Sequence, residues 1–203
     1  LGAVGIPAPA FLGGMDDAAL PPPAPRRSVF MDIYAAFARQ HMRLYGSTAE
    51  QFAAVAAKNH AHSVHNERAQ YRRSYTTAEV LADRPIVWPL TLPMCAPVSD
   101  GAAAAILCTE AGLRRLGAHA RAVELRACVL GTSVDRHPDD IERHIGRVTA
   151  LKAFEAASIG SEDIDVAEVH DATAVGEVIQ VENLGLCPRG LGGEAALRGQ
   201  TCL

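Results

Sequence analysis

The alternation of strand-like and helix-like stretches between residues 100 and 184 is the feature that most constrains the fold. Apolar or alternating runs typical of strands occupy residues 100–108, 121–134 and 163–169. Helical patterns occupy residues 109–117, 145–160 and 172–184. This order predicts a layered α/β fold, in which helices cover a mixed sheet.

The first hundred residues have a different character. Residues 1–27 hold half of the twelve prolines, which predicts a loop or an extended arm. Helical spacing predicts helices over 28–45 and 47–63, the second opened by a Ser47–Glu50 capping box, and a third, short helix begins at Thr77. Three prolines within 86–99 predict an irregular segment, and the Gly-rich stretch 187–203 shows no clear element.

Composition and charge exclude several classes of function. The formal net charge of −4, with both signs mixed, argues against a nucleic-acid partner. No apolar run approaches the roughly 18 residues that span a bilayer, so we expect no membrane insertion, and the first residues do not read as a secretory signal. Five scattered cysteines without a CxxC pair indicate a reducing, cytoplasmic setting.

His170 and Asp171 stand where a predicted strand gives way to a predicted helix. One interpretation is a core or cap histidine bonded to backbone, with Asp171 capping the helix. The other is functional, because open α/β sheets bind ligands at the carboxyl ends of their strands. There His170 can donate a hydrogen bond to a developing oxyanion, and Asp171 can fix its tautomer or hold its charge. The residues alone leave both open.

Two further stretches invite functional interpretations. His60, His62 and His65 form a cluster, but their spacing does not match the i, i+4 pairs of helical metal sites, so we expect no metal. The stretch "MCAPVSDGAAAA" contains Pro97 and Gly101, which suit either a rigid loop lining a narrow substrate channel or a simple turn.

Four stretches, in order, resemble the thiolases, and most closely the sterol-carrier-protein-type, lipid-transfer-associated branch. They include "PLTLPMCAPVSDGAAAAIL", "DIDVAEVHDATAVGEVIQVENLGLCPRG" and the terminal "RGQT", after the helical stretch that contains "AKNHAHSVHNE". The resemblance implies a layered αβαβα fold that acts on acyl-CoA thioesters. It implies coenzyme A as a substrate and no tightly bound cofactor. Residues 1–92 would then form the loop-domain region and residues 93–203 a core segment.

The resemblance also implies roles for particular residues. His170 and Asp171 match the branch's His-Asp pair, where the histidine serves an oxyanion hole. Five other residues match positions that border the acyl and pantetheine channel: Cys95, Ala96, Pro97, Ala172 and Thr173. The branch usually continues His-Asp with Cys-Phe, so Ala-Thr here changes the width or polarity of the channel and puts the substrate in doubt.

No Gly-His-Pro motif occurs, and none of the five cysteines matches a catalytic cysteine of the family. We therefore expect a central fragment of a thiolase-like subunit. Three functions follow from the resemblance: an acyl-CoA C-acyltransferase acting on lipid or sterol side chains, a retro-aldolase working with an OB-fold partner, or a non-catalytic acyl-CoA-binding subunit. Family members are usually homodimers or tetramers.

Overall fold

The structure, a computed structural model, describes residues 28–117 and 121–202, so the predicted arm at 1–27 lies outside it. The helices are α1 (Val29–Tyr45), α2 (Ala49–Ser63), α3 (Thr77–Ala82), α4 (Glu110–Leu116), α5 (Ile145–Ala157), α6 (Ala174–Asn183) and α7 (Gly192–Leu197). Two 3₁₀ turns, η2 (Leu92–Met94) and η4 (Ser161–Asp163), and two strands, β1 (Pro85–Val87) and β2 (Leu90–Thr91), complete them. The predicted helices over 28–45, 47–63, 109–117, 145–160 and 172–184 are thus confirmed within a few residues.

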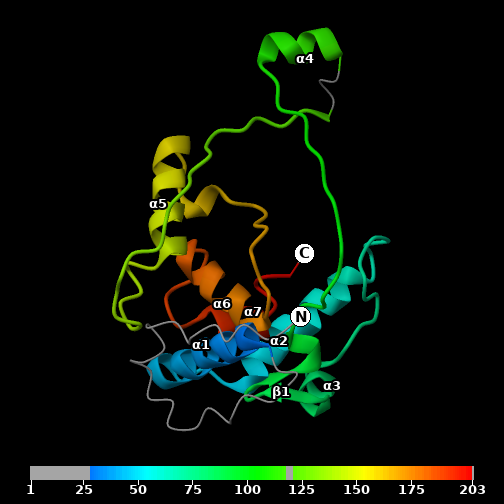
Figure 1. Cartoon of the computed structure of the whole chain (residues 1–203), viewed down its shortest axis with the longest axis vertical. Coiled ribbons are helices and arrows are strands. Elements are labelled where there is room, and N and C mark those ends of the chain that lie inside the picture. Colours follow the sequence, from blue (N-terminus) through cyan, green and yellow to red (C-terminus); the bar gives the residue numbers. More distant parts are fainter. Residues whose placement is uncertain (1–27, 118–120, 203) are drawn as a thin grey trace, which may run out of the picture.

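The core lies where α2 packs against α3, α6 and α7, with α1 alongside α6. These helices gather at one end of the molecule in Figure 1, with α4 at the other. Phe52, Val80, Leu90 and Val175 are fully buried, together with several alanines of α1 and α2. Small side chains let the helices approach closely, and this accounts for a core with few aromatic rings.

The start of α2 differs from the predicted capping box by one residue. The Thr48 hydroxyl accepts the Gln51 backbone N–H at 3.3 Å, and the Gln51 side chain accepts the Thr48 N–H at 3.2 Å. Ser47 is buried, and its hydroxyl instead contacts His41 Nδ1 at 2.7 Å. The predicted Ser47–Glu50 box is therefore wrong, because tertiary packing takes the Ser47 hydroxyl away from the helix.

Residues 85–94 form a short antiparallel hairpin followed by a 3₁₀ turn, with a cis peptide bond between Trp88 and Pro89. The prediction of an irregular segment in place of a central strand is confirmed here. Thr91 is anchored by a hydrogen bond of 2.7 Å from its hydroxyl to the Val80 carbonyl oxygen. After the hairpin, η2 contacts α2. Residues 93–97 then form the first part of the candidate site.

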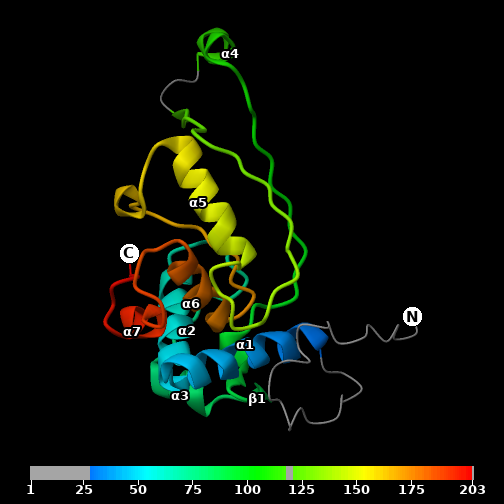
Figure 2. The ribbon, with the colours of Figure 1, turned by 90° about the vertical axis from the view of Figure 1, so that its left-hand side faces the viewer.

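The predicted strands at 100–108, 121–134 and 163–169 do not form in the described part of the chain. Figures 1 and 2 show the chain running out from the helical body to α4 and, before α5, running back toward that body. Along this path Ile106 and Leu130 are 83% and 96% exposed. A strand is stabilised by the hydrogen-bonded neighbour beside it, and these segments have none among the described residues.

The prediction that residues 187–203 contain no element is also wrong, because α7 forms there. Its first residue, Gly192, donates its backbone N–H to Glu182 Oε1 at 2.9 Å. A Cβ at Gly193 would stand only 2.8 Å from Gln51 Cβ. Gly192 and Gly193 therefore allow α7 to pack closely on α6 and α2. The prediction failed because a Gly-rich composition is typical of a loop.

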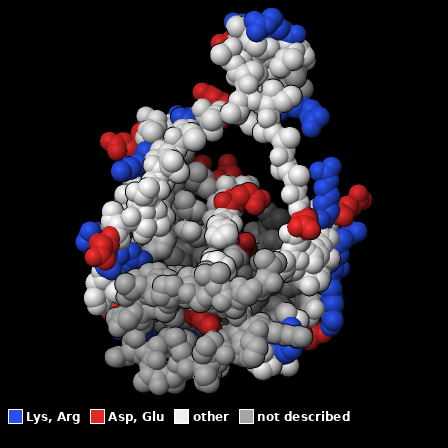
Figure 3. Space-filling view, in the orientation of Figure 1, with Lys and Arg blue, Asp and Glu red and all other residues white. Residues whose placement is uncertain are grey.

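Charges of both signs lie next to one another on the face seen in Figure 3. Several pair locally, as Arg114 does with Glu110 on α4 and Arg43 with Asp139. None of the described helices has the length and apolar character needed to cross a bilayer.

Candidate functional site

One main-chain contact brings together the two stretches singled out in the sequence. The Ala96 backbone N–H donates to the Ala172 carbonyl oxygen at 3.0 Å, and Cys95 and Thr173 face each other as an isolated antiparallel bridge. The loop after η2 is thereby held against the residues that precede α6. Segments more than seventy positions apart in the sequence meet at this point.

A cleft with a volume of about 210 Å³ opens beside this contact. One wall comes from the loop after the hairpin and the start of α6, and the other comes from α2. The lining residues from the first wall are Pro93, Met94, Cys95, Ala96, Pro97, Asp171 and Ala174. Those from the second wall and the loop after it are Ala56, Asn59, His60, Ser63 and Tyr71.

The polar side of the cleft is a connected set of side chains. Asn59 Nδ2 donates to Asp171 Oδ2 at 3.3 Å and to Glu177 Oε2 at 2.7 Å. The other Glu177 oxygen pairs with Lys58 Nζ at 2.8 Å, and both of these side chains are largely buried. The buried Lys58–Glu177 ion pair thus fixes the Asn59 amide, and this amide in turn binds the Asp171 carboxylate in the cleft.

Burial changes the acidity of two groups in the cleft. Partial burial of the Asp171 carboxyl group, together with the nearby Glu177 charge, raises the pKa of Asp171. Burial raises the pKa of the Cys95 thiol to about 11. Because the thiolate is the nucleophilic form, Cys95 is unsuited to covalent catalysis at neutral pH and acts here as a wall residue.

The remaining predicted residues lie near the cleft without lining it. His170 is exposed, and Ala172 is half-buried. Thr173 is 1% exposed and precedes the first residue of α6, and within the described part of the chain its hydroxyl has no hydrogen-bond partner. The structure therefore places Cys95, Ala96, Pro97 and Asp171 together, and the catalytic role of His170 stays a prediction.

The sequence interpretation missed Lys58, Asn59 and Glu177. Each had a signal: Asn59 shares a helical face with Ala56 and Ser63, which also line the cleft, and Glu177 interrupts the otherwise apolar start of α6. An acid within an apolar helical face is buried only when it is paired. The sequence did not identify the partner, because α2 lies more than a hundred residues earlier.

The histidine cluster separates in space. His60 lines the cleft, where its Nε2 contacts the Pro93 carbonyl oxygen at 3.1 Å and its ring packs on Tyr75. Burial lowers the pKa of His62, assisted by the nearby Lys58 charge. Within residues 28–117 and 121–202, no three acids, cysteines or histidines are grouped to hold a metal ion.

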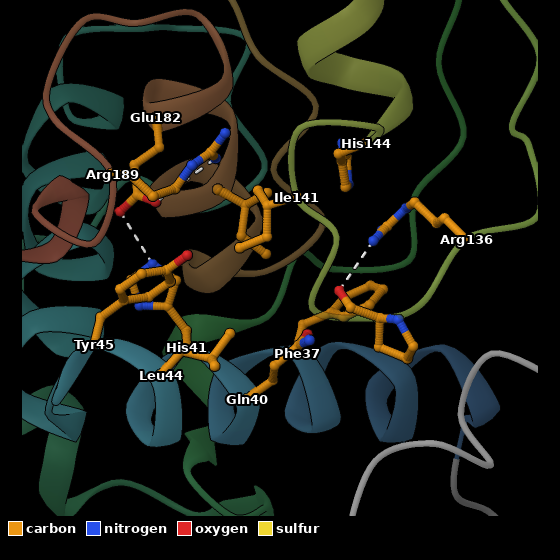
Figure 4. A pocket seen from close by; sticks show the side chains of 12 residues that line it. Phe37, Gln40, His41, Leu44, Tyr45, Arg136, Ile141, His144, Glu182 and Arg189 are labelled. Atoms are coloured by element: carbon orange, nitrogen blue, oxygen red, sulfur yellow. Dashed lines mark hydrogen bonds and ion pairs between the residues drawn. The ribbon is translucent and has the colours of Figure 1, made fainter.

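A second polar cluster lies between α1 and α6 beside a cavity of about 40 Å³ (Figure 4). His41 Nε2 contacts Glu182 Oε1 at 3.0 Å, while His41 Nδ1 contacts the Ser47 hydroxyl. All three residues are at most 5% exposed. His41 and Glu182 line the cavity and Ser47 does not, and the two contacts of His41 join α1 to α6 and to the residues before α2.

Residues 131–203 match the family described as "Thiolase C-terminal domain-like". The chain belongs to the thiolase superfamily, and its helices and short strands represent a thiolase-like α/β fold incompletely. This confirms the predicted fold class. The boundary predicted at residues 92 and 93 stays a prediction, and α2 packs across it on α6 and α7.

Within the superfamily the chain is similar to sterol carrier protein 2 of Oryctolagus cuniculus, at 37% identity over 82% of this chain and 32% of that protein. It is 38% identical to an acetyl-CoA acetyltransferase of Methanothermobacter thermautotrophicus, over 85% of this chain and 45% of the other. The solved structure of an Ltp2-ChsH2(DUF35) aldolase matches with a TM-score of 0.62 and 25% identity, over 81% of this chain and 45% of that one. The chain thus spans about a third of the sterol carrier proteins and under half of the other two.

Proposed function

We propose that the full-length protein is a thiolase-type acyl-CoA C-acyltransferase, acting on 3-oxoacyl-CoA derived from a lipid or a sterol side chain. The observation that carries this proposal is the main-chain bridge from Ala96 to Ala172, beside a cleft that Asp171 also lines. A cleft with small apolar residues along one wall and a few convergent polar groups suits an acyl-pantetheine arm. Coenzyme A enters here as a substrate.

In this proposal the residues of the chain bind and orient the thioester. Residues 95–97 form the wall along the arm, and the backbone N–H groups at the start of α6 favour negative charge near Asp171. His170 donates a hydrogen bond to the thioester oxygen as charge builds on it, and the neighbouring Asp171 carboxylate fixes the tautomer of the imidazole. In this proposal the acylated cysteine comes from another part of the full-length protein, because none of the five cysteines of this chain matches a catalytic position of the family.

Substitution of His170→Ala in the full-length enzyme tests this role. Removal of one oxyanion donor lowers kcat by roughly 10²–10³-fold in acyl transfer. We expect a loss of this order in thiolysis of a 3-oxoacyl-CoA, with KM changed much less. The control is His65→Ala, because His65 is exposed and does not line the cleft. Equal rates for both variants would remove His170 from the mechanism.

A retro-aldolase is the second candidate, and two observations favour it. The similar solved structure carries the name of an aldolase, and Ala172–Thr173 departs from the usual Cys-Phe of the branch. In this case the protein works with an OB-fold partner and needs no acylated cysteine. Full-length protein that cleaves a 3-hydroxyacyl-CoA without added CoA, and does not thiolyse a 3-oxoacyl-CoA, supports the aldolase.

A non-catalytic, acyl-CoA-binding subunit is the third candidate function. It predicts saturable acyl-CoA binding with neither reaction, and calorimetry on the same full-length preparation measures that binding. In either catalytic case we expect a homodimer or a tetramer, which light scattering determines directly.

A further inference from the structure

One amide of α2 joins two carboxylates of the α6 region. Asn59 Nδ2 lies 3.3 Å from Asp171 Oδ2 and 2.7 Å from Glu177 Oε2. Ionised carboxylates only accept hydrogen bonds, so the nitrogen of the amide must face both of them. An amide nitrogen carries two hydrogens, and one hydrogen serves each acid. The donors of this nitrogen are thus fully used between Asp171 and Glu177.

The two ends of this bridge are in different surroundings. Glu177 is 5% exposed and is held on its other side by Lys58 Nζ at 2.8 Å. Asp171 instead lines the cleft. A buried charge with two good partners is fixed in place, since breaking either contact leaves it unsatisfied. Glu177 is therefore the fixed, buried end of the bridge, and Asp171 is the end that lines the cleft. Because Asn59 is hydrogen-bonded to both, the position of Glu177 restrains the position of the Asp171 carboxylate.

We propose that Asn59 is a positioning residue for the reaction: its amide holds the Asp171 carboxylate in the cleft by joining it to the fixed Glu177. This inference rests on the proposed function. Asn59 also lines the cleft, but its assigned role is carried out through Asp171. Nothing in the sequence pattern of the His-Asp pair points to this residue, which comes from a helix more than a hundred positions earlier.

The charges around Asp171 determine what the loss of Asn59 does. Glu177 opposes ionisation of Asp171, Lys58 and His170 favour it, and Tyr34 of α1 is close enough that the Asp171 charge contributes to raising the tyrosine pKa, after burial. A hydrogen bond to a carboxylate stabilises its ionised form, so its removal raises the pKa of Asp171 further. Activity that needs ionised Asp171 then begins at a higher pH.

The test uses the full-length enzyme with Asn59→Leu, which keeps the branched shape and the number of heavy atoms of the side chain and removes both donors. We expect kcat to fall about 10–100-fold, as for other lost orienting contacts, and the acidic limb of the pH profile of kcat/KM to move to higher pH. Asn66→Ala is the matched control, because Asn66 is exposed, follows α2 and does not line the cleft. A merely structural role would lower stability and leave the limb in place.

Three outcomes are distinct. If wild-type enzyme neither thiolyses nor cleaves acyl-CoA substrates, the proposed function fails. If wild-type enzyme is active and Asn59→Leu keeps the wild-type pH profile, the positioning role is overturned. Should Asn59→Leu fail to fold by thermal melting, Asn59→Asp replaces it. It keeps the shape, adds a third acid and is expected to move the limb further, so an unmoved limb in that variant also overturns the inference.

Discussion

Glu182 is the residue on which the packing of α1, α6 and α7 converges. It accepts hydrogen bonds from His41 Nε2 and from the Gly192 backbone N–H, and it is 3% exposed. Burial alone would raise the pKa of Glu182, but the bonds from His41, followed by the backbone N–H groups of Gly190 and Gly192, lower it below its ordinary value. Its contribution to stability is therefore complete above the unfolded-state pKa and is lost as the pH falls through the lower folded-state pKa.

Substitution of Glu182→Gln in the full-length protein is expected to destabilise it by roughly 1–3 kcal/mol at neutral pH, because charged hydrogen bonds are lost inside the core. Urea denaturation measures the change. Glu110→Gln is the control, since its partner Arg114 lies on the same exposed helix face, and it is expected to cost at most about 0.5 kcal/mol. Equal losses for the two variants would contradict the role of Glu182.

Sequence reasoning identified single residues only where a pattern marked them. Cys95, Ala96 and Pro97 were predicted to border the channel and Asp171 to belong to the catalytic pair, and all four line the cleft. Asn59 was not predicted, because its importance comes from a partner on a distant helix. His170 was singled out because it comes shortly before α6, but the sequence does not determine where its exposed side chain points.

Among the helices, α5 shows how a single cap makes an element sensitive to pH. His144 Nδ1 accepts the Gly146 backbone N–H at 3.0 Å, which satisfies a free donor at the first turn. Burial first, and then the charges of Arg136 and Arg189, lower the pKa of His144 to about 4. Between pH 6.5 and 4 the unfolded chain binds more protons than the folded one, so stability falls as the pH falls through this window.

Substitution of His144→Asn retains a capping side chain and removes the titration. We expect the urea midpoint of this full-length variant to fall less than that of wild type between pH 7 and pH 5. His65→Asn, at an exposed position, is the control and should follow the wild type. A variant at position 144 with an unchanged acid dependence would show that other groups cause it.

Helices could be predicted because their apolar spacing and end signals are local, as Thr76–Glu79 at the start of α3 shows. The strand pattern is equally visible in residues 121–134, but a strand also depends on a neighbour that the pattern does not contain. Helix α7 was missed for the opposite reason. Its glycines read as breakers, whereas close packing on α2 and α6 favours them.

The molecule as a whole combines a packed helical body with extended segments rich in exposed apolar residues. Ile106, Leu107, Val123 and Leu130 are each more than 80% exposed. Apolar surface of this extent is usually covered by further protein. The apolar pattern that predicted strands at 100–108 and 121–134 is consistent with these segments packing against further protein.

Hydrogen exchange on the 203-residue chain measures this difference directly. We expect amides within residues 100–108 and 121–134 to exchange rapidly, because they have no strand partner in the structure, while α2 and α6 are protected. In the full-length protein the same segments should gain protection. Slow exchange of both segments in the 203-residue chain would contradict the extended arrangement.

The bridge from Ala96 to Ala172 has a consequence for how the cleft can change. It is made by peptide groups alone, so mutation can replace the side chains at both positions without undoing it. A change of the side chain at position 96, which lines the cleft, can therefore alter the shape of the cleft while the two segments stay joined.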